Sequence, residues 1–206
     1  MTPTKRVFDI VLAFFCAGLL ILPCFLVAGV LLFVQGRPVF YLSERMKTQD
    51  QSFLLWKFRT MQCASVNLGV SGGDKTPRIT RTGHFLRRTR LDEIPQLWNI
   101  LRGEMSFVGP RPPLREYVER FPNLYADVLQ SRPGITGLAT IIFHKREEQL
   151  LAVCITPAQT DAVYVARCIP RKARLDLIYQ KKQTVVLDIG LLMATVFALG
   201  KNGRSA

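Results

Sequence analysis

The stretch from Asp9 to Gly36, DIVLAFFCAGLLILPCFLVAGVLLFVQG, decides what kind of fold this chain of 206 residues can have. Between Ile10 and Val34 it contains no charged side chain. About 20 apolar residues are enough for a helix to span a bilayer, and this run is longer than that. It is also too long for the apolar part of a signal peptide. The sequence therefore predicts a long membrane helix near the N-terminus.

Two features leave open whether this helix spans the membrane or re-enters it. Pro23, near the middle, removes one backbone hydrogen bond and kinks a helix. Both flanks are basic, and basic flanks favour the cytoplasmic side of a membrane. The flanking residues are Lys5 and Arg6 before the run, and Arg37, Arg45 and Lys47 after it. A helix that bends at Pro23 and leaves on the side where it entered satisfies both features. On composition alone, a kinked spanning helix is an equal alternative.

The charge balance and the cysteines bound the class of protein. The formal net charge is +13, with 28 Lys and Arg against 15 Asp and Glu, which suits nucleic acid, anionic lipid or a phosphorylated substrate as partner. His84 and His144 are far apart, which argues against a His-based metal site or a Ser-His-Asp triad. The cysteines form no C-x-x-C pair, which indicates reduced thiols rather than a disulfide framework or a zinc site. They are Cys16, Cys24, Cys63, Cys154 and Cys168.

The remaining pattern predicts an α+β fold that is mostly helical with few short strands. Strands are predicted at residues 38–46 and 53–61, where aromatic and aliphatic residues cluster on either side of a polar turn, although the second segment could also begin a helix. Helices are predicted at 83–90, 94–103, 112–130, 145–152 and 171–183, with loops at 64–80 and 132–134. Residues 184–200 are apolar but too short to span, which fits an interfacial helix or a buried core helix.

Asp92 and Glu93 are an acid pair within RRTRLDEIPQLWNILRGEMSFVGPRPP, residues 87–113. The ordinary interpretation is helix capping, because Thr89 and Asp92 match a capping pattern and Pro95 suits a first turn. The functional interpretation is that a carboxylate among arginines keeps a low pKa, attacks phosphorus or binds a divalent ion. Adjacent helical residues point about 100° apart, so the two acids should have different roles.

Arginines near this acid pair are suited to phosphate. A guanidinium meets two phosphate oxygens in a bidentate fork. The prolines of GPRPP would hold Arg111 in a rigid loop, and Arg132 in SRPGITG repeats the arrangement. Mg²⁺ bridging a carboxylate and a diphosphate would reduce the repulsion between the two anions. Each loop could equally be a structural turn.

Five stretches occur in the order of a known family's motifs: KRVFDIVLA, QGRPVFY, WKFRTM, PRITRTGHFLRRTRLDEIPQLWNILRGEMSFVGPRPP and RPGITG. They resemble the bacterial sugar transferases, which are monotopic phosphoglycosyl transferases. The resemblance runs from about Lys5 to Gly137 and resumes at LDLIY. It implies transfer of a sugar 1-phosphate from a UDP-sugar to polyprenyl phosphate, usually undecaprenyl phosphate. UMP would leave, and a covalent phosphosugar on an aspartate would form in a ping-pong route that initiates glycoconjugate synthesis.

The resemblance also implies roles for individual residues. Asp92 would be the nucleophile and a metal ligand, with Glu93 as its partner, and Pro23 would break a re-entrant helix. The matching substrate-binding positions are Lys57, Arg87, Arg111, Arg132 and Asp176. The second acid pair, Glu147–Glu148, lies outside the motifs and is expected on a helix surface.

The expected organisation is a monotopic α+β protein, with a re-entrant membrane helix over residues 1–36. Residues 37–206 would form a catalytic domain with interfacial amphipathic helices on the cytoplasmic face of the bacterial inner membrane. The expected cofactor is Mg²⁺, or Mn²⁺ in its place. The expected partners are a UDP-sugar, polyprenyl phosphate and membrane phospholipids but not nucleic acid, and homo-oligomerisation stays open. The alternatives are a membrane-anchored polyanion-binding protein and a nucleotide-diphosphate hydrolase.

Overall fold

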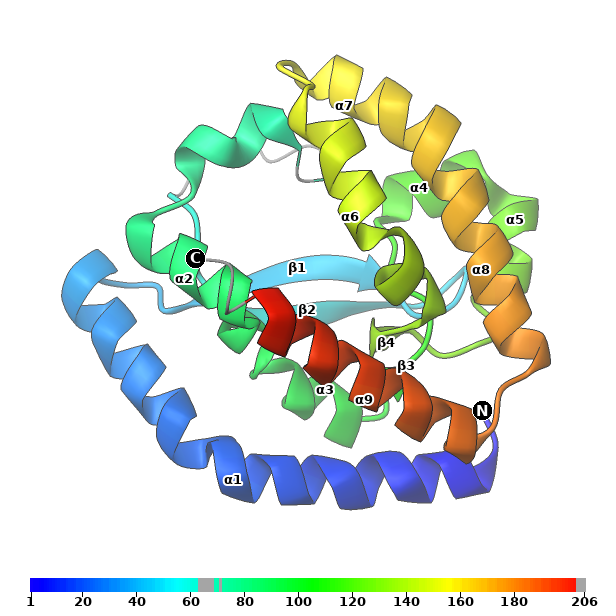
Figure 1. The fold of residues 1–206 in the computed structure, drawn as a ribbon, viewed down its shortest axis with the longest axis horizontal. Coiled ribbons are helices and arrows are strands. Elements are labelled where there is room, and N and C mark those ends of the chain that lie inside the picture. Colours follow the sequence, from blue (N-terminus) through cyan, green and yellow to red (C-terminus); the bar gives the residue numbers. More distant parts are fainter. Residues whose placement is uncertain (63–68, 71, 203–206) are drawn as a thin grey trace.

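The computed structural model describes residues 1–62, 69–70 and 72–202, so Cys63 and part of the predicted loop 64–80 lie outside it. The described chain is mostly helical with few strands, which agrees with the predicted α+β class (Figure 1). The helices are α1 (Pro3–Gln35), α2 (Arg81–Thr89), α3 (Gln96–Leu101), α4 (Arg115–Arg120), α5 (Pro122–Val128), α6 (Leu138–Ala152), α7 (Pro157–Val163), α8 (Ile169–Lys181) and α9 (Val185–Asn202).

The described residues contain two pairs of strands in addition to the helices. β1 (Phe40–Met46) and β2 (Ser52–Phe58) form an antiparallel hairpin, which confirms the two predicted strands. β3 (Ser106–Val108) and β4 (Gly134–Thr136) pair in parallel, and neither strand was predicted from the sequence. Each has three residues, which is too short to leave the alternating pattern by which a strand is recognised.

Helix α1 is long, apolar and bent. Figure 1 shows two arms that meet at a bend, the effect expected of Pro23 inside the helix. Within the described residues, α1 is the helix whose length and composition would allow it to cross a membrane. Large apolar side chains in its middle are exposed, and they include Phe14, Phe15, Leu19, Ile21, Leu22, Phe25 and Leu26.

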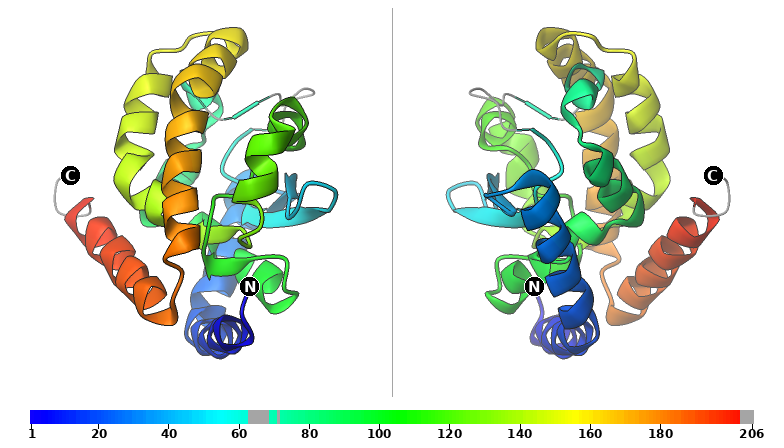
Figure 2. Two further views of the ribbon diagram at one scale, coloured as in Figure 1. Left: turned by 90° about the vertical axis from the view of Figure 1, so that its right-hand side faces the viewer. Right: turned by 90° about the vertical axis from the view of Figure 1, so that its left-hand side faces the viewer.

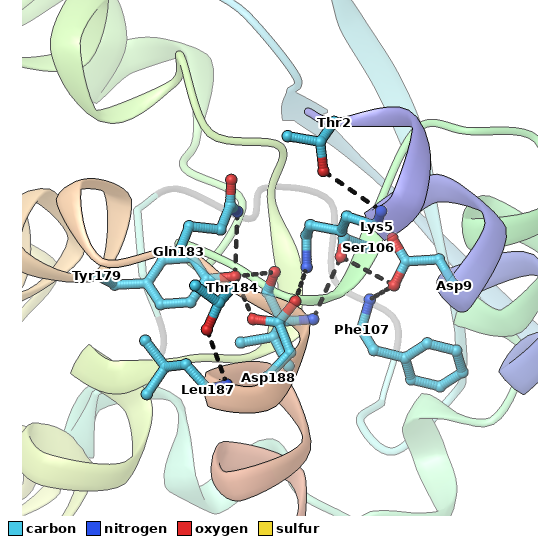
Figure 3. Close-up of polar contacts among 11 residues, drawn as sticks. Thr2, Lys5, Asp9, Ser106, Phe107, Tyr179, Gln183, Thr184, Leu187 and Asp188 are labelled. Carbon is cyan, nitrogen blue, oxygen red and sulfur yellow. Dashed lines mark hydrogen bonds and ion pairs between the residues drawn. The ribbon is translucent and has the colours of Figure 1, made fainter.

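The first arm of α1 is fixed to the rest of the protein by a buried polar cluster (Figure 3). Lys5 pairs with Asp188 of α9, and both side chains are almost fully buried. Asp9 accepts hydrogen bonds from the Ser106 hydroxyl at 3.1 Å and from the backbone of β3. The Tyr179 hydroxyl lies 2.6 Å from a carboxylate oxygen of Asp188. The cluster therefore joins α1, β3, α8 and α9 at one point.

The second arm of α1 returns to the same domain. Leu31 packs with Phe58 of β2 and Leu86 of α2 in a small buried cluster. The Arg59 guanidinium donates a hydrogen bond of 2.6 Å to the carbonyl of Gln35, the last residue of α1. A straight helix of these 33 residues would be about 50 Å long. The bend therefore lets both ends of α1 contact one domain.

Helices α4 to α8 surround the main apolar core, and several of their bounds differ from the predicted ones. The single helix predicted over 112–130 is two helices, because Pro122 starts a new one. α6 begins seven residues before the predicted start. The segment between the predicted helices at 145–152 and 171–183, for which no helix was predicted, contains α7 and a π-helical turn over Tyr164–Cys168, next to Pro170, which lacks an N–H. The core includes Tyr117, Tyr125, Phe143, Leu151, Tyr164 and Ile169.

Helix α9 presents an apolar face to the outside. Leu191 packs into the core and Asp188 is buried, so this side of the helix contacts the described part of the protein. The opposite side exposes Val186, Ile189, Met193, Val196 and Phe197. Figure 2 shows α9 along the outer edge of the molecule in both views. Of the two predicted alternatives, the interfacial helix fits this exposure, whereas a buried core helix does not.

Candidate active site

The acid pair lies in a tight turn between α2 and α3. Arg90 has a φ of 59°, an uncommon left-handed conformation for a residue other than glycine. The following residues form a 3₁₀ turn over Leu91–Glu93. The Thr89 hydroxyl donates to the carbonyl of Phe85 at 2.9 Å, so Thr89 belongs to the end of α2. The capping role expected of Thr89 is therefore wrong, because Thr89 does not cap the turn that carries the acids, whereas Pro95 directly precedes α3 as expected.

Glu93 is held by three cations. Its carboxylate oxygens lie 2.8 Å from the Lys57 ammonium, 3.4 Å from Arg111 and 3.7 Å from Arg90. Burial alone would raise the pKa of Glu93, but Lys57, Arg111 and Arg90 outweigh it and hold the pKa well below its ordinary value. Glu93 is therefore a permanent anion whose oxygens are already engaged.

Asp92 is the less satisfied member of the pair. It is buried, and its Oδ1 atom has no hydrogen-bond partner among the described residues. Burial raises the pKa of Asp92, Lys57 opposes the rise, and the neighbouring Glu93 adds to it. The predicted low pKa of Asp92 is therefore wrong for the protein without substrate, because desolvation outweighs the nearby cations. The predicted difference in role between the two acids is consistent with their different surroundings.

Lys57 and Arg87 reach the pair from two different elements. Lys57 projects from β2, which is tied to α3 because the Asn99 side chain bonds the backbone of Leu54 and Trp56. Arg87 projects from α2, and its Nε donates to the Thr60 hydroxyl at 2.9 Å. Burial lowers the pKa of Arg87, and the charge of Asp92 partly opposes this. Both residues predicted to bind substrate thus lie beside the acid pair.

Arg111 is carried by a loop that is packed tightly against the chain after Arg132. The Gly109 N–H donates to the carbonyl of Thr136, and the Gly134 N–H donates to that of Pro110. A Cβ atom at Gly109 would lie only 2.1 Å from the Arg132 carbonyl oxygen. Close backbone packing at these glycines therefore fixes the loop, and this adds to the stiffness that the prolines provide.

Arg132 itself lies elsewhere, close to the start of α1. A Cβ built at Gly103 would be 3.3 Å from the guanidinium of Arg6 and 3.5 Å from that of Arg132. Burial lowers the pKa of Arg132, as does the charge of Arg6, while Asp9 opposes both effects. The structure thus places Arg132 beside the first arm of α1, and its role in substrate binding stays a prediction.

Asp176 belongs to a second buried group. Burial raises its pKa to about 7, Lys172 opposes this rise and Glu147 adds to it. Lys172 pairs with Glu147 at 2.8 Å, and Glu147 is mostly buried. The prediction that Glu147 lies on a helix surface is wrong, since α8 covers it, whereas Glu148 is 65% exposed. Burial would lower the pKa of Arg111, but the charges of Glu93 and Glu147 raise it, so Arg111 lies within the electrostatic influence of both groups.

Three residues of this region were not predicted as site residues: Arg90, Lys172 and His144. Arg90 was visible in the sequence beside the acid pair, but its contact with Glu93 depends on the left-handed turn. Lys172 and His144 come from α8 and α6, and no spacing in the sequence connects them to the acid pair.

A single divalent cation fits Asp92. Mg²⁺ is commonly held by one or two carboxylates together with substrate phosphates and water. The unpartnered Oδ1 atom of Asp92 supplies one such carboxylate. Groups of three or more His, Cys, Asp or Glu arranged for a metal are absent from the described ranges. The substrate would therefore have to supply further ligands.

Comparison with known proteins agrees with the resemblance seen in the sequence. The model of the bacterial sugar transferase family matches residues 1–202. The chain is 40% identical over 140 residues to the uncharacterized sugar transferase EpsL of Bacillus subtilis (strain 168), a match covering 66% of this chain and 67% of EpsL. It is 34% identical over 199 residues to the UDP-glucose:undecaprenyl-phosphate glucose-1-phosphate transferase of Escherichia coli (strain K12).

That second match covers 94% of this chain but 39% of the Escherichia coli protein. A third relative is the UDP-N-acetylgalactosamine-undecaprenyl-phosphate N-acetylgalactosaminephosphotransferase of Aeromonas hydrophila, 37% identical over 145 residues, covering 67% of this chain and 34% of the relative. The chain therefore spans two thirds of EpsL but little more than a third of the two larger enzymes. By its family match and these relatives, the chain belongs to the bacterial sugar transferase family and is a phosphoglycosyl transferase by class.

Proposed function

We propose that this protein transfers a sugar 1-phosphate from a UDP-sugar to undecaprenyl phosphate, or another polyprenyl phosphate, and releases UMP. The names of the Escherichia coli and Aeromonas hydrophila relatives describe transfer of a sugar phosphate to undecaprenyl phosphate. A simple polyanion-binding protein would not need two buried carboxylates among its cations, because they would repel the anion.

One observation carries the assignment of the nucleophile. Glu93 is held by Lys57, Arg90 and Arg111, whereas the Oδ1 atom of Asp92 is unpartnered in the described structure. An oxygen that attacks phosphorus needs a free lone pair. Asp92 is therefore the nucleophile, and Glu93 holds the surrounding cations in place.

The reaction then has two balanced steps. An Asp92 carboxylate oxygen attacks the phosphorus that bears the sugar, the bond from that phosphorus to the bridging oxygen breaks, and UMP leaves with the electron pair. An oxygen of polyprenyl phosphate next attacks the phosphorus of the aspartyl phosphosugar. The bond to Asp92 breaks, the carboxylate is regenerated, and a polyprenyl diphosphosugar forms.

The basic residues offset the charge of these anionic groups. Lys57, Arg87 and Arg111 surround the acid pair, and only Arg111 is well exposed, with 39% of its side chain accessible. A guanidinium can bind two phosphate oxygens at once. Arg111 is therefore placed to meet the incoming diphosphate, while Lys57 and Arg87 keep the acid pair oriented. A bound divalent cation would lower the pKa of Asp92 and neutralise diphosphate charge.

The proposed reaction is tested by measuring UMP release from a panel of UDP-sugars with and without undecaprenyl phosphate. A ping-pong transferase should release at most about one UMP per protein molecule without the lipid and should turn over repeatedly with it. Repeated release of UMP without lipid would instead show a nucleotide-diphosphate hydrolase. The sugar that supports turnover identifies the donor.

Activity should depend on a divalent cation held at Asp92, because the nucleophile and the diphosphate are both anionic. Protein stripped with EDTA is expected to lose nearly all turnover and to regain it when Mg²⁺ or Mn²⁺ is added back. Zn²⁺ and Ca²⁺ at equal concentration serve as controls for metal choice. Full turnover of stripped protein in excess EDTA would contradict the proposal.

The proposed membrane arrangement is monotopic, at the cytoplasmic face of the bacterial inner membrane. Both ends of α1 contact the same domain, while its exposed apolar middle would lie in the bilayer. The exposed apolar side of α9 would lie along the membrane surface. This arrangement would hold the acid pair near the headgroups, where a soluble UDP-sugar can meet a lipid phosphate.

Replacing Pro23 with Leu is expected to straighten α1 and move part of the protein into a spanning topology. A Cys at position 4, which is exposed, reports the side of the N-terminus in a background without the five native cysteines. In spheroplasts, a membrane-impermeant thiol reagent should leave the parent unlabelled and label a fraction of the Pro23→Leu variant. Leu22→Val, which keeps the proline, is the matched control. Labelling of the parent would show that the helix spans.

A further inference from the structure

His144 of α6 contacts two groups of opposite character through one atom. Its Nε2 lies 3.0 Å from an Arg90 guanidinium nitrogen and 3.3 Å from a carboxylate oxygen of Glu148. Arg90 and His144 are far apart in the sequence, so the fold alone brings them together. Glu148 is on the same face of α6 as His144, four residues later.

These two contacts require opposite protonation states of Nε2. A guanidinium can only donate hydrogen bonds, so Arg90 needs an unprotonated Nε2 that accepts. A carboxylate can only accept, so Glu148 needs a protonated Nε2 that donates. The ring can satisfy Arg90 only as the neutral tautomer with its proton on Nδ1. It can satisfy Glu148 through Nε2 only if that atom carries a proton.

The surroundings favour the contact with Arg90 at neutral pH. Burial lowers the pKa of His144, and the charges of Arg90 and Arg111 lower it further, while Glu148 and Glu147 oppose them. Because the pKa is lowered, the neutral ring prevails at pH 7 and the proton is gained only as the pH falls below the ordinary range of histidine. Glu148 is 65% exposed and can bind water instead.

Arg90 links this histidine to the acid pair. Its guanidinium lies 3.7 Å from the Glu93 carboxylate. Its backbone is left-handed and immediately precedes the 3₁₀ turn that carries Asp92 and Glu93. Fixing a long, partly exposed arginine side chain costs conformational entropy, and an acceptor on the far side of the guanidinium offsets that cost. His144 is the acceptor that the described structure provides there.

We propose that His144 is a positioning residue of the transfer reaction, which as a neutral Nε2 acceptor holds the Arg90 guanidinium against Glu93. The effect of this role on catalysis rests on the proposed function, whereas the protonation state of the His144 ring does not. When His144 gains a proton, Nε2 turns from Arg90 to Glu148, and Arg90 loses its fixed position beside the acid pair.

The state of the ring can be measured without any assay of activity. The chain has two histidines, so His84→Gln, at an exposed position of α2, leaves His144 as the single imidazole signal in an ¹⁵N NMR spectrum. At pH 7.5 we expect the Nδ1–H tautomer. Glu148→Gln should lower the pKa of the ring, and Arg90→Asn, which suits the left-handed backbone, should raise it. An Nε2–H tautomer at pH 7.5, or a pKa unchanged by both variants, would overturn the proposal.

Kinetics test the effect on the reaction. His144→Leu removes the acceptor and should lower kcat/KM by about ten- to a hundredfold, the size of loss that a small misplacement near a site can cause. His144→Gln places an amide oxygen near the position of Nε2 and should recover most of that loss. Arg146→Gln, at an exposed position of α6 two residues after His144, controls for changes to the helix and should behave as wild type.

The pH profile separates positioning from a purely structural role. In the wild type, kcat/KM should fall as the pH drops through the pKa found by NMR. This acidic limb of the pH profile should shift to lower pH in Glu148→Gln and disappear in His144→Gln. An equal loss in the Leu and Gln variants, or an unchanged limb in His144→Gln, would refute the positioning role. If the wild type releases no UMP at all, the proposed function fails, and the NMR result still decides the state of the ring.

Discussion

Replacement of Asp92 with asparagine is expected to lower turnover by at least about a thousandfold, because an amide cannot form the covalent phosphosugar. The measurement is UMP release with undecaprenyl phosphate, together with mass spectrometry of the protein after incubation with UDP-sugar alone. The parent should gain the mass of one sugar phosphate, and the Asp92→Asn variant should gain none.

The same variant should fold as well as the parent. Burial raises the pKa of Asp92, which means that the neutral form is the better tolerated one in the protein without substrate. Asparagine is uncharged and of similar size, so thermal unfolding should occur at or above the parent's temperature. Loss of activity can therefore be separated from loss of structure. Retention of more than about a tenth of the parent's turnover would sink the assignment of Asp92 as nucleophile.

Glu93→Gln changes the neighbouring acid and is the variant to compare with Asp92→Asn. It removes the charge that pairs with Lys57, Arg90 and Arg111, and so leaves the mostly buried Lys57 and the two neighbouring arginines without their anion. We expect lower stability as well as lower activity. A covalent phosphosugar should still form, slowly, because Asp92 is retained. The two variants thus distinguish the residue that reacts from the residue that organises the site.

Replacing Lys5 with methionine is expected to lower the free energy of unfolding by about 3–5 kcal/mol, the usual cost of breaking a buried ion pair by removing one partner. Asp188 would keep its charge in a position with no exposed surface. Figure 3 shows that this pair joins α1 to α9, so its loss should also loosen the first arm of α1. Thermal unfolding of the parent and the variant in lipid nanodiscs measures this change in the free energy of unfolding.

The double variant Lys5→Met with Asp188→Asn should recover part of the loss, because the uncompensated charge is gone while the Tyr179 hydroxyl keeps an acceptor. The matched control is the pair of Arg115 and Glu44, which is 45% and 48% exposed. Arg115→Gln should cost less than about 1 kcal/mol, as exposed ion pairs do. Equal effects of Lys5→Met and Arg115→Gln would show that the cluster does not anchor α1.

Local patterns in the sequence were sufficient for several parts of this fold. The uncharged run from Ile10 to Val34 predicted the apolar helix, and the clustered aromatic residues on either side of a polar turn predicted the hairpin. The ordered motifs around Asp92 and Glu93 predicted the family and the location of the acid pair. All of these depend on residues that are neighbours along the chain, and the physical rules for helices, strands and turns act over such short distances.

Only the tertiary structure decided which groups are paired and which are free. The sequence could not show that Glu93 is held by Lys57 and Arg111 while an oxygen of Asp92 has no hydrogen-bond partner among the described residues. It placed Glu147 on a surface, although α8 covers that residue and supplies Lys172 as its partner. Burial and ion pairing depend on atoms that distant segments bring within a few ångströms. The protonation and reactivity of a carboxylate follow from those atoms, and so they were determined by the fold and not by the local sequence.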